Sequence, residues 1–272
     1  MNIISSSQND KVKYLNKLYR SRNRRKEGVF ILEGKRLIEA ALAGGADFKQ
    51  VFLTPAFFKS AENNNLLADL KLKAEFIYIE ESLLKETAST VNPQGILAVV
   101  EESVFKGEDF YQKADKILLL DRIQDPGNMG TMIRTAAAAG FDGIIALKGS
   151  VDIYNQKVIR ATMGGIFSIA IRQKLSQNEF LAEIKNQAAD YELLAADIGA
   201  EEYHFEHQYQ NKLILMIGNE ANGLEQALLK TAGSKIKIPL AGDVESLNAA
   251  VAASVISFEI LSQQLKNNNS IW

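Results

Sequence analysis

The sequence predicts an α/β protein with a mostly parallel sheet in its second half, and three observations support this fold class. Short apolar runs alternate with segments of helical periodicity along most of the chain. Three apolar runs of the second half, at 117–120, 213–217 and 236–238, each lead into a loop rich in polar residues and glycine. Because parallel strands end at one edge of their sheet, we expect these loops to form a single site.

Length and composition limit the classes of protein to be considered. A chain of 272 residues with 47% hydrophobic and 24% charged residues is typical of a soluble globular protein and long enough for two domains. The absence of cysteine excludes disulfides and any cysteine-based metal site or nucleophile. No apolar run approaches the ~18 residues that span a membrane, and residues 1–7 lack the apolar core of a secretory signal. We therefore expect a cytoplasmic protein without a membrane segment.

Charge is distributed unevenly along the chain. Residues 1–36 carry ten Lys or Arg and three Asp or Glu, a local charge of +7, whereas the remaining residues sum to −9. The densest basic stretch is residues 20–26, Arg-Ser-Arg-Asn-Arg-Arg-Lys. Such a cluster can neutralise phosphates and release counterions, so it favours RNA or another polyanion as a partner. The alternative is a solvated helix end without a ligand.

The pattern of elements divides the chain near residue 104. Residues 1–103 are predicted to form a small α/β domain, residues 104–114 a polar linker, and residues 115–272 a second α/β domain. The first domain is expected to contain helices at 9–20, 35–42, 66–72 and 82–88 and strands at 29–32, 51–53, 76–79 and 96–100. The second is expected to contain strands at 117–120, 144–147, 168–171, 193–196, 213–217 and 236–238, and helices at 129–139 and 246–265.

The first polar block is Asp125-Pro126-Gly127-Asn128, between a strand and an alanine-rich helix. Asn128 stands where that helix is expected to begin, and a role as N-cap would by itself explain it. Arg134 follows within the same helix and could reach a ligand at the sheet edge; its alternative role is an ordinary surface charge.

The second block, Gly218-Asn219-Glu220 with Gly223, follows a strongly apolar strand. Its glycines allow the backbone to approach a ligand closely. It lacks the Lys-Ser/Thr pair of a phosphate-binding loop, its glycine spacing does not fit a dinucleotide site, and the Glu220 carboxylate would repel a pyrophosphate. The block therefore favours a zwitterionic or cationic ligand. The third block, Ser246-Leu247-Asn248, opens the last long helix, and Ser246 is expected to cap it.

Together the three blocks resemble the SpoU (TrmH) family of RNA methyltransferases in the SPOUT superfamily. The similarity covers roughly residues 116–265, and its motifs are residues 120–130 with Arg134, residues 217–224, and residues 238–252. Leu240 stands where methionine is usual, and Ala221 where glycine is frequent; neither change removes a reactive group. Residues 1 to about 100 resemble the small, ribosomal-protein-like α/β domain that accompanies several members of the family.

This resemblance implies a C-terminal α/β knot, in which a deep trefoil knot forms an S-adenosylmethionine pocket, although general topology rules would not suggest a knot. It also implies a homodimer through the C-terminal domain and methyl transfer to a ribose 2′-hydroxyl, in ribosomal RNA rather than transfer RNA. The positions that match the family's reaction centre are Asn128, Arg134, Glu220, Ser246 and Asn248, and those that match its cofactor site are Gly218, Ile238, Leu240 and Leu247. The RNA-binding residues, which the charge distribution also indicates, are Lys11, Lys13, Arg22, Arg24 and Arg25.

Arg134 needs a role that its chemistry permits. The family's corresponding arginine is proposed to act at the reacting hydroxyl, as a base in one version of the mechanism. A guanidinium is not normally deprotonated in proteins, so we expect Arg134 to clamp a phosphate and orient the hydroxyl. A nearby phosphate or water would then accept the proton.

Two other functions compete with this prediction. A protein that kept the fold but lost catalysis would bind RNA or assist ribosome assembly, and the retention of all five reaction-centre residues argues against it. A nucleotide-dependent enzyme on an ordinary doubly wound sheet would need a phosphate-binding motif that the chain lacks. His204 and His207 have no supporting ligand set and are expected to be surface residues of a loop, so no metal is predicted.

Overall fold

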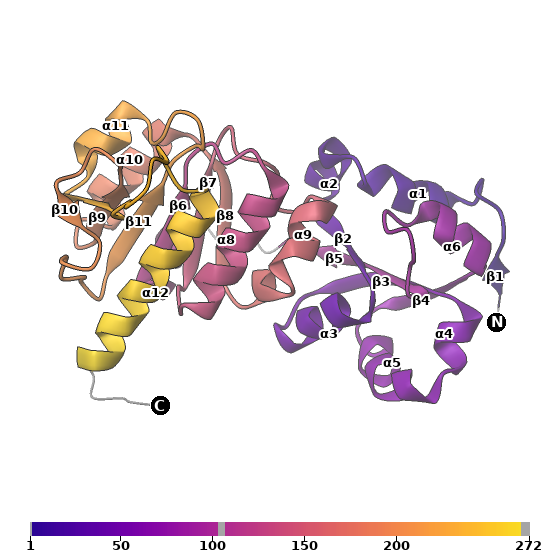
Figure 1. Ribbon diagram of the computed structural model, residues 1–272. Coiled ribbons are helices and arrows are strands. Elements are labelled where there is room, and N and C mark those ends of the chain that lie inside the picture. Colours follow the sequence, from indigo (N-terminus) through magenta and orange to yellow (C-terminus); the bar gives the residue numbers. More distant parts are fainter. Residues whose placement is uncertain (1, 103–106, 268–272) are drawn as a thin grey trace. The chain divides into compact units, whose positions relative to one another are not determined.

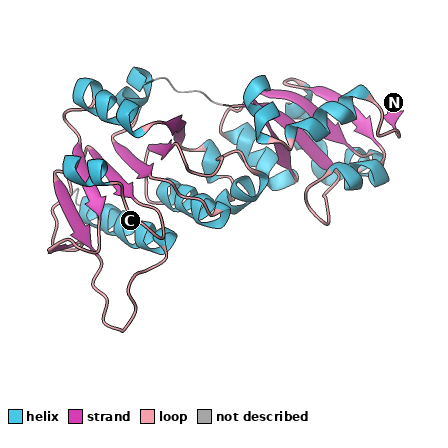
Figure 2. Cartoon of the chain, turned by 90° about the horizontal axis from the view of Figure 1, so that it is seen from above, coloured by secondary structure: helices cyan, strands magenta, loops and turns pink. Residues whose placement is uncertain are grey.

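The computed structural model describes residues 2–102 and 107–267, and the chain divides into two compact units. The first unit comprises residues 1–103 and 154–167, and the second comprises residues 104–153 and 168–272. A short segment from within the second predicted domain thus packs with the first unit. Strands and helices alternate in both units (Figure 2).

The first unit contains a five-stranded sheet, counted over the described residues, in the order β1-β4-β3-β5-β2. Strand β5 is antiparallel to both of its neighbours, and the remaining pairs are parallel. Residues 96–100 of β5 are all buried, because helices cover both faces of the sheet. The strands are Ile3–Ile4 (β1), Val29–Glu33 (β2), Phe48–Leu53 (β3), Glu75–Ile79 (β4) and Ile96–Glu101 (β5).

Helices α1 and α6 lie on one face of this sheet, and α3 and α5 lie on the other (Figure 1). The apolar positions of α1, Val12, Leu15 and Leu18, recur at helical spacing and are fully buried against the strands. The helices of the unit are Asp10–Leu18 (α1), Ser21–Glu27 (α2), Lys35–Ala43 (α3), Pro55–Lys59 (α4), Asn64–Lys71 (α5), Glu81–Thr87 (α6) and Gln156–Thr162 (α9), with 3₁₀ turns at Ala61–Asn63 (η1) and Gly165–Phe167 (η2).

Helix α9 belongs to the first unit because it packs against β2. Gln156 Nε2 donates a buried hydrogen bond to the Ile31 carbonyl at 2.9 Å. The rings of Tyr154 and Phe30 stack with their centroids 4.5 Å apart. These contacts depend on side chains far apart in the sequence, so the alternation of strands and helices did not predict them.

The second unit contains a seven-stranded sheet within the described residues, in the order β10-β12-β9-β11-β6-β7-β8, and all of its pairs are parallel. This confirms the predicted α/β class and the parallel sheet, whereas threading of the chain through a knot stays a prediction. The strands are Lys116–Leu120 (β6), Gly143–Leu147 (β7), Ala170–Leu175 (β8), Glu192–Ala196 (β9), Glu202–Tyr203 (β10), Leu213–Ile217 (β11) and Ser234–Lys237 (β12).

Helices cover both faces of this sheet as well. One face carries a core to which α7, α10 and α11 contribute Phe110, Phe180 and Leu228. On the other face α8 and α12 lie against each other (Figure 1), with the Thr135 and Ser254 hydroxyls 3.1 Å apart. The helices are Gly107–Lys113 (α7), Pro126–Ala138 (α8), Gln177–Gln187 (α10), Gln226–Thr231 (α11) and Ala249–Asn267 (α12).

Several boundaries differ from the prediction. Residues 104–106 of the predicted linker lie outside the described residues, and residues 107–113 form helix α7 instead of a loop. Helix α8 begins at Pro126 with Asp125 as its N-cap, so the alternative role of Asn128 as the N-cap is excluded. Helix α12 begins at Ala249, and Asn248, not Ser246, accepts hydrogen bonds from its first turn.

Candidate active site

The first two motif loops leave the sheet side by side. Strands β6 and β11 pair in parallel, with Leu120 opposite Ile217 at their carboxyl ends. The Asp121 N–H, just beyond β6, donates to the Ile217 carbonyl at 2.9 Å. The loops that follow these strands are therefore neighbours at the carboxyl edge, as the apolar runs predicted.

Asn128 lies in the first turn of α8 and reaches the second motif loop. Asp125 Oδ1 accepts the Asn128 N–H at 2.7 Å, which satisfies a free donor at the helix start. Asn128 Nδ2 then donates to Glu220 Oε1 at 2.8 Å. The cap thus fixes the backbone of Asn128 and leaves its side-chain amide for contacts outside the helix.

Asn248 brings the third motif to the same point. Strand β12 is separated from β11 by β9, so sheet order alone would leave this motif at a distance. Helix α12 returns to pack against α8, and Asn248 Nδ2 donates to Asn128 Oδ1 at 3.0 Å. The three residues Asn248, Asn128 and Glu220 form a continuous hydrogen-bonded series, here called the polar chain, that joins all three motifs.

The loop that carries Glu220 is a tight turn held by its own residues. Asn219 and Gly223 exchange backbone hydrogen bonds of 3.1 and 2.9 Å. Asn219 Oδ1 also accepts the N–H groups of Ala221 and Asn222. Gly218 permits this turn because a Cβ there would lie 2.2 Å from backbone atoms of Gly223 and Leu224. Gly218 therefore shapes the loop; it is not among the residues that line the cavity described next.

An apolar cavity of about 90 Å³ adjoins the third motif. Ile238, Leu240 and Leu247, predicted to bind a cofactor, all line it, and so does Ser246. The prediction did not include the other lining residues, although the loop after strand 193–196 offered the same signal of a strand end followed by polar residues. These residues are Ala196, Asp197, Ile198, Ile236, Lys237, Ala252 and Ile256.

Arg134 and Ser246 stand apart from the polar chain. The Arg134 side chain is exposed, and it lies six positions after Asn128, or about 120° around the helix. Within the described ranges, the Arg134 side chain makes no hydrogen bond or ion pair. Ser246 is exposed beside the cavity. Three of the five predicted reaction-centre residues are therefore joined by hydrogen bonds, as members of the polar chain.

The predicted RNA-binding residues of the first unit differ in their surroundings. Lys13, Arg22 and Arg25 are exposed, and Lys11 is paired with Glu75. Arg24 is only 2% exposed, and its guanidinium donates to the Leu18 and Tyr19 carbonyls at 2.9 Å. Because these carbonyls end helix α1, Arg24 serves as a C-terminal cap and does not belong to the exposed basic surface.

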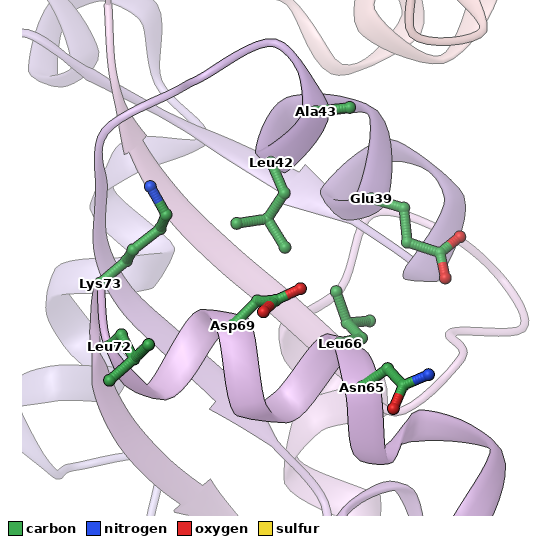
Figure 3. A pocket seen from close by; sticks show the side chains of 8 residues that line it. All are labelled: Glu39, Leu42, Ala43, Asn65, Leu66, Asp69, Leu72 and Lys73. Carbon is green, nitrogen blue, oxygen red and sulfur yellow. The ribbon is translucent and has the colours of Figure 1, made fainter.

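A second cavity, of about 460 Å³, lies between α3 and α5 of the first unit (Figure 3). Its apolar lining residues are Leu42, Ala43, Leu66 and Leu72. Its lining also holds two carboxylates, of Glu39 and Asp69, against one ammonium, of Lys73, so the balance of charge disfavours phosphate groups. This cavity is therefore a poor site for RNA. The exposed basic residues of α1 and α2 form a better RNA-binding site.

His204 and His207 are buried, at 9% and 7% exposure, so the prediction of surface histidines was wrong. Glu192 Oε1 lies 2.6 Å from Nε2 of His207, and Glu202 Oε2 lies 3.0 Å from its Nδ1. Both ring nitrogens are thus occupied by carboxylates of β9 and β10. In the ranges 2–102 and 107–267, no group of three or more His, Asp or Glu side chains could hold a metal ion, and no helix is long and apolar enough to cross a membrane.

Comparisons with known proteins agree on one family. A model described as the SpoU rRNA Methylase family matches residues 115–258, and one described as an MRM3-like substrate binding domain matches residues 9–98. An uncharacterized tRNA/rRNA methyltransferase of Synechocystis is 35% identical, over 96% of this chain and 94% of that protein. A 23S rRNA (guanosine(2553)-2′-O)-methyltransferase of Bacillus subtilis, RlmP, is 33% identical, over 96% of this chain and 99% of its own.

A similar solved structure is the AdoMet-bound rRNA methyltransferase of Sinorhizobium meliloti. It superposes with a TM-score of 0.86 and 27% identity, over 97% of this chain and 98% of that one. The similarity covers both units of the chain, so the first unit is as much part of the relationship as the second.

Proposed function

This chain belongs to the SpoU rRNA methylase family of S-adenosylmethionine-dependent RNA methyltransferases, and we propose that it methylates a ribose 2′-hydroxyl of ribosomal RNA. The observation that carries this proposal is the polar chain, which joins the three motifs beside an apolar cavity. The named reaction of the Bacillus subtilis relative supports the ribose as the acceptor and ribosomal RNA as the substrate. A cytoplasmic location stays a prediction.

The residues around the apolar cavity fit the adenosyl part of S-adenosylmethionine. Its walls are largely apolar, and no hydrogen bond among the described residues occupies a backbone N–H or carbonyl of residues 239–247. An adenine needs apolar contacts on its faces and free polar groups at its edge, and this segment offers both. A pocket that encloses an entire cofactor of this size has a volume of at least ~300 Å³. Part of the ligand would therefore lie outside the cavity, against the exposed residues 241–248.

S-adenosylmethionine supplies a methyl group on a sulfonium, so the protein must mainly position the hydroxyl and help remove its proton. Each side-chain amide of the polar chain has two N–H groups. Asn128 uses one for Glu220, and Asn248 uses one for Asn128. The second N–H of each remains for ribose oxygens, and the Glu220 carboxylate holds the Asn128 amide in one orientation.

We propose that Arg134 binds a phosphate next to the reacting ribose. Its guanidinium is exposed, keeps its charge, and can bind a phosphate with two parallel hydrogen bonds. It would orient the nucleotide, and a phosphate oxygen or water would accept the hydroxyl proton. Ser246, exposed at the cavity, would contact the ligand from the side of the third motif.

We also propose a homodimer formed through α12. Val251, Val255 and Phe258 are 48%, 37% and 48% exposed and recur at i, i+4 and i+7, which places them on one face of the helix. Large apolar side chains gathered on one exposed face indicate a protein partner, and a second copy is the partner the resemblance implies. Val255→Glu should convert a dimer into a monomer by light scattering coupled to gel filtration. A monomeric wild-type chain would contradict the proposal.

The exposed basic residues of the first unit are proposed to bind the RNA backbone. Arg22→Gln combined with Arg25→Gln should weaken RNA binding and reduce the slope of log K against log salt by about 1.5, since each lost phosphate contact removes ~0.7 on a single strand and ~0.9 on a duplex. Lys49→Gln is a matched control, because it removes a cation of the same unit that is paired with Glu101. An unchanged slope in the double variant would place the RNA elsewhere.

Methyl transfer from labelled S-adenosylmethionine to ribosomal RNA tests the function directly. The product should resist alkaline hydrolysis at one position, because a 2′-O-methyl group removes the nucleophile that cleaves the chain. Label on a base, or on transfer RNA alone, would overturn the reaction or the substrate. If calorimetry shows no binding at millimolar S-adenosylmethionine, the chain is instead an RNA-binding protein on the same fold.

A further inference from the structure

Arg122 stands two residues beyond β6, near the start of the first motif, and its side chain reaches the second motif loop. Its backbone φ is 56°, a left-handed conformation that residues other than glycine seldom adopt. Gly149 leaves room for its side chain, since a Cβ there would lie 2.9 Å from Arg122 Cγ. The surrounding structure thus maintains Arg122 in an unfavourable local geometry, and such residues cluster at functional sites.

The guanidinium of Arg122 connects the two loops. Nε and Nη2 donate to the two oxygens of the buried Asp121 carboxylate, at 3.0 and 2.8 Å. Nη2 also donates to the Gly223 carbonyl at 3.1 Å, and Nη1 lies 3.4 Å from Glu225 Oε1. The Asp121 carboxylate raises the pKa of this guanidinium above its ordinary value. One planar cation therefore spans from the end of β6 to the far side of the second motif loop.

Two more hydrogen bonds attach the second motif loop to the same place. Asn219 Nδ2 donates to the Arg122 carbonyl at 2.9 Å. The Glu225 N–H donates to Asp121 Oδ2 at 3.0 Å. Both ends of the loop 219–225 are thus tied to residues 121 and 122. Glu220 is itself exposed and lies between these attachments, so its position depends on the loop and not on its own packing.

We propose that Arg122 is a positioning residue for methyl transfer, which acts by holding the second motif loop where Glu220 accepts the Asn128 amide. This inference rests on the proposed function. Arg122 itself is not among the residues that line the apolar cavity or hydrogen-bond Asn128. Its loss should therefore displace Glu220 and Asn128 while leaving the cofactor site and the RNA-binding residues of the first unit in place.

Steady-state kinetics of Arg122→Gln test this role. The kcat should fall about 10- to 100-fold, because small misplacements in a reaction centre have effects of this size. The Kd for S-adenosylmethionine and the KM for RNA should stay at the wild-type values. Arg122→Lys keeps the charge but not the planar fork, so it should restore only part of kcat. Arg172→Gln is the matched control: it removes an arginine of the same unit that is paired with Glu183, and it should lower stability but not kcat.

Two further measurements separate positioning from general stability. In the double variant with Glu220→Gln, the loss of kcat should be smaller than the product of the two single losses, since both act on one loop. Amide hydrogen exchange of residues 219–223 should be faster in Arg122→Gln and unchanged in Arg172→Gln. Wild-type kcat in Arg122→Gln, or losses that multiply, would overturn the positioning role alone. A wild-type chain that methylates no RNA would overturn the proposed function and this inference together.

Discussion

Two polar clusters of the second unit are built in opposite ways. The polar chain Asn248–Asn128–Glu220 is open to solvent at both of its ends, and its members come from the three motifs. His207 is instead buried between the carboxylates of Glu192 and Glu202. An exposed group whose partner is removed is hydrated again, whereas a buried one is left unpaired at a high cost. The first cluster should therefore govern activity and the second stability.

The largest expected effect on kcat is that of Arg134, which is exposed like the polar chain but does not belong to it. Arg134→Ala should lower kcat by ~10²–10³-fold, the range seen when one transition-state donor is lost. The midpoint of thermal unfolding and calorimetric S-adenosylmethionine binding should stay unchanged, because the side chain is exposed and apart from the cavity. Arg134→Lys, which keeps the charge, is the control and should retain more activity. Near-normal turnover in Arg134→Ala would exclude this residue from the reaction centre.

His207→Ala should have the converse effect. It leaves the largely buried Glu192 carboxylate without its imidazole partner, whereas the half-exposed Glu202 is hydrated, so the free energy of unfolding should fall by about 1–3 kcal/mol. Urea denaturation measures this loss, and kcat of the folded fraction should be kept. Gln208→Ala, at the exposed neighbouring position, should leave stability unchanged. A loss of kcat without a loss of stability would reverse the assignment of the two clusters.

Asn248 should contribute both to stability and to activity, and Asn248→Ala tests the two contributions. As the N-cap of α12 it should contribute about 1 kcal/mol to stability. As a member of the polar chain it should contribute about tenfold to kcat. Asn248→Asp retains a capping oxygen but cannot donate to Asn128, so it should restore stability and not kcat. Recovery of both quantities together would mean that Asn248 acts only as a cap.

Gln263→Ala should have the smallest effect. Gln263 Nε2 donates to the His207 carbonyl at 3.0 Å and links α12 to the buried cluster. Loss of one such bond should lower the free energy of unfolding by about 0.5–1.5 kcal/mol, measured by urea denaturation, without a change in kcat. A larger loss would show that α12 and the histidine loop stabilise each other through more than this bond.

Much of the sheet could be predicted from apolar runs, because a strand buried on both faces is read directly as a continuous apolar segment. Residues 213–217 form β11 as expected, and the loops after 120 and 217 meet as parallel strands require. Helix starts were less predictable. Asp125 and Asn128 are both good capping residues, as are Ser246 and Asn248, and only the path of the backbone decides which of them accepts the first N–H groups.

Burial of charged and ionisable residues was the other limit of prediction. Arg24 stands in a run of basic residues that otherwise faces solvent, yet α2 folds back so that its guanidinium reaches the carbonyl end of α1. His207 lies in a segment that reads as a loop, and the carboxylates that enclose it come from two different strands. Neither partnership has a local signal, because the partners meet only when separate elements pack together.

The amino-acid sequence by itself determined the α/β class, the strands of the parallel sheet other than the short β10, the charge asymmetry, and the three motif loops. These features depend on local periodicity and composition, which a single segment carries alone. Only the tertiary structure decided that α12 returns to α8, that Asn248 contacts Asn128, that residues 154–167 join the first unit, and that Arg122 connects two loops. Each of these depends on the packing of elements distant in the chain, where geometry selects one partner among many of similar chemistry.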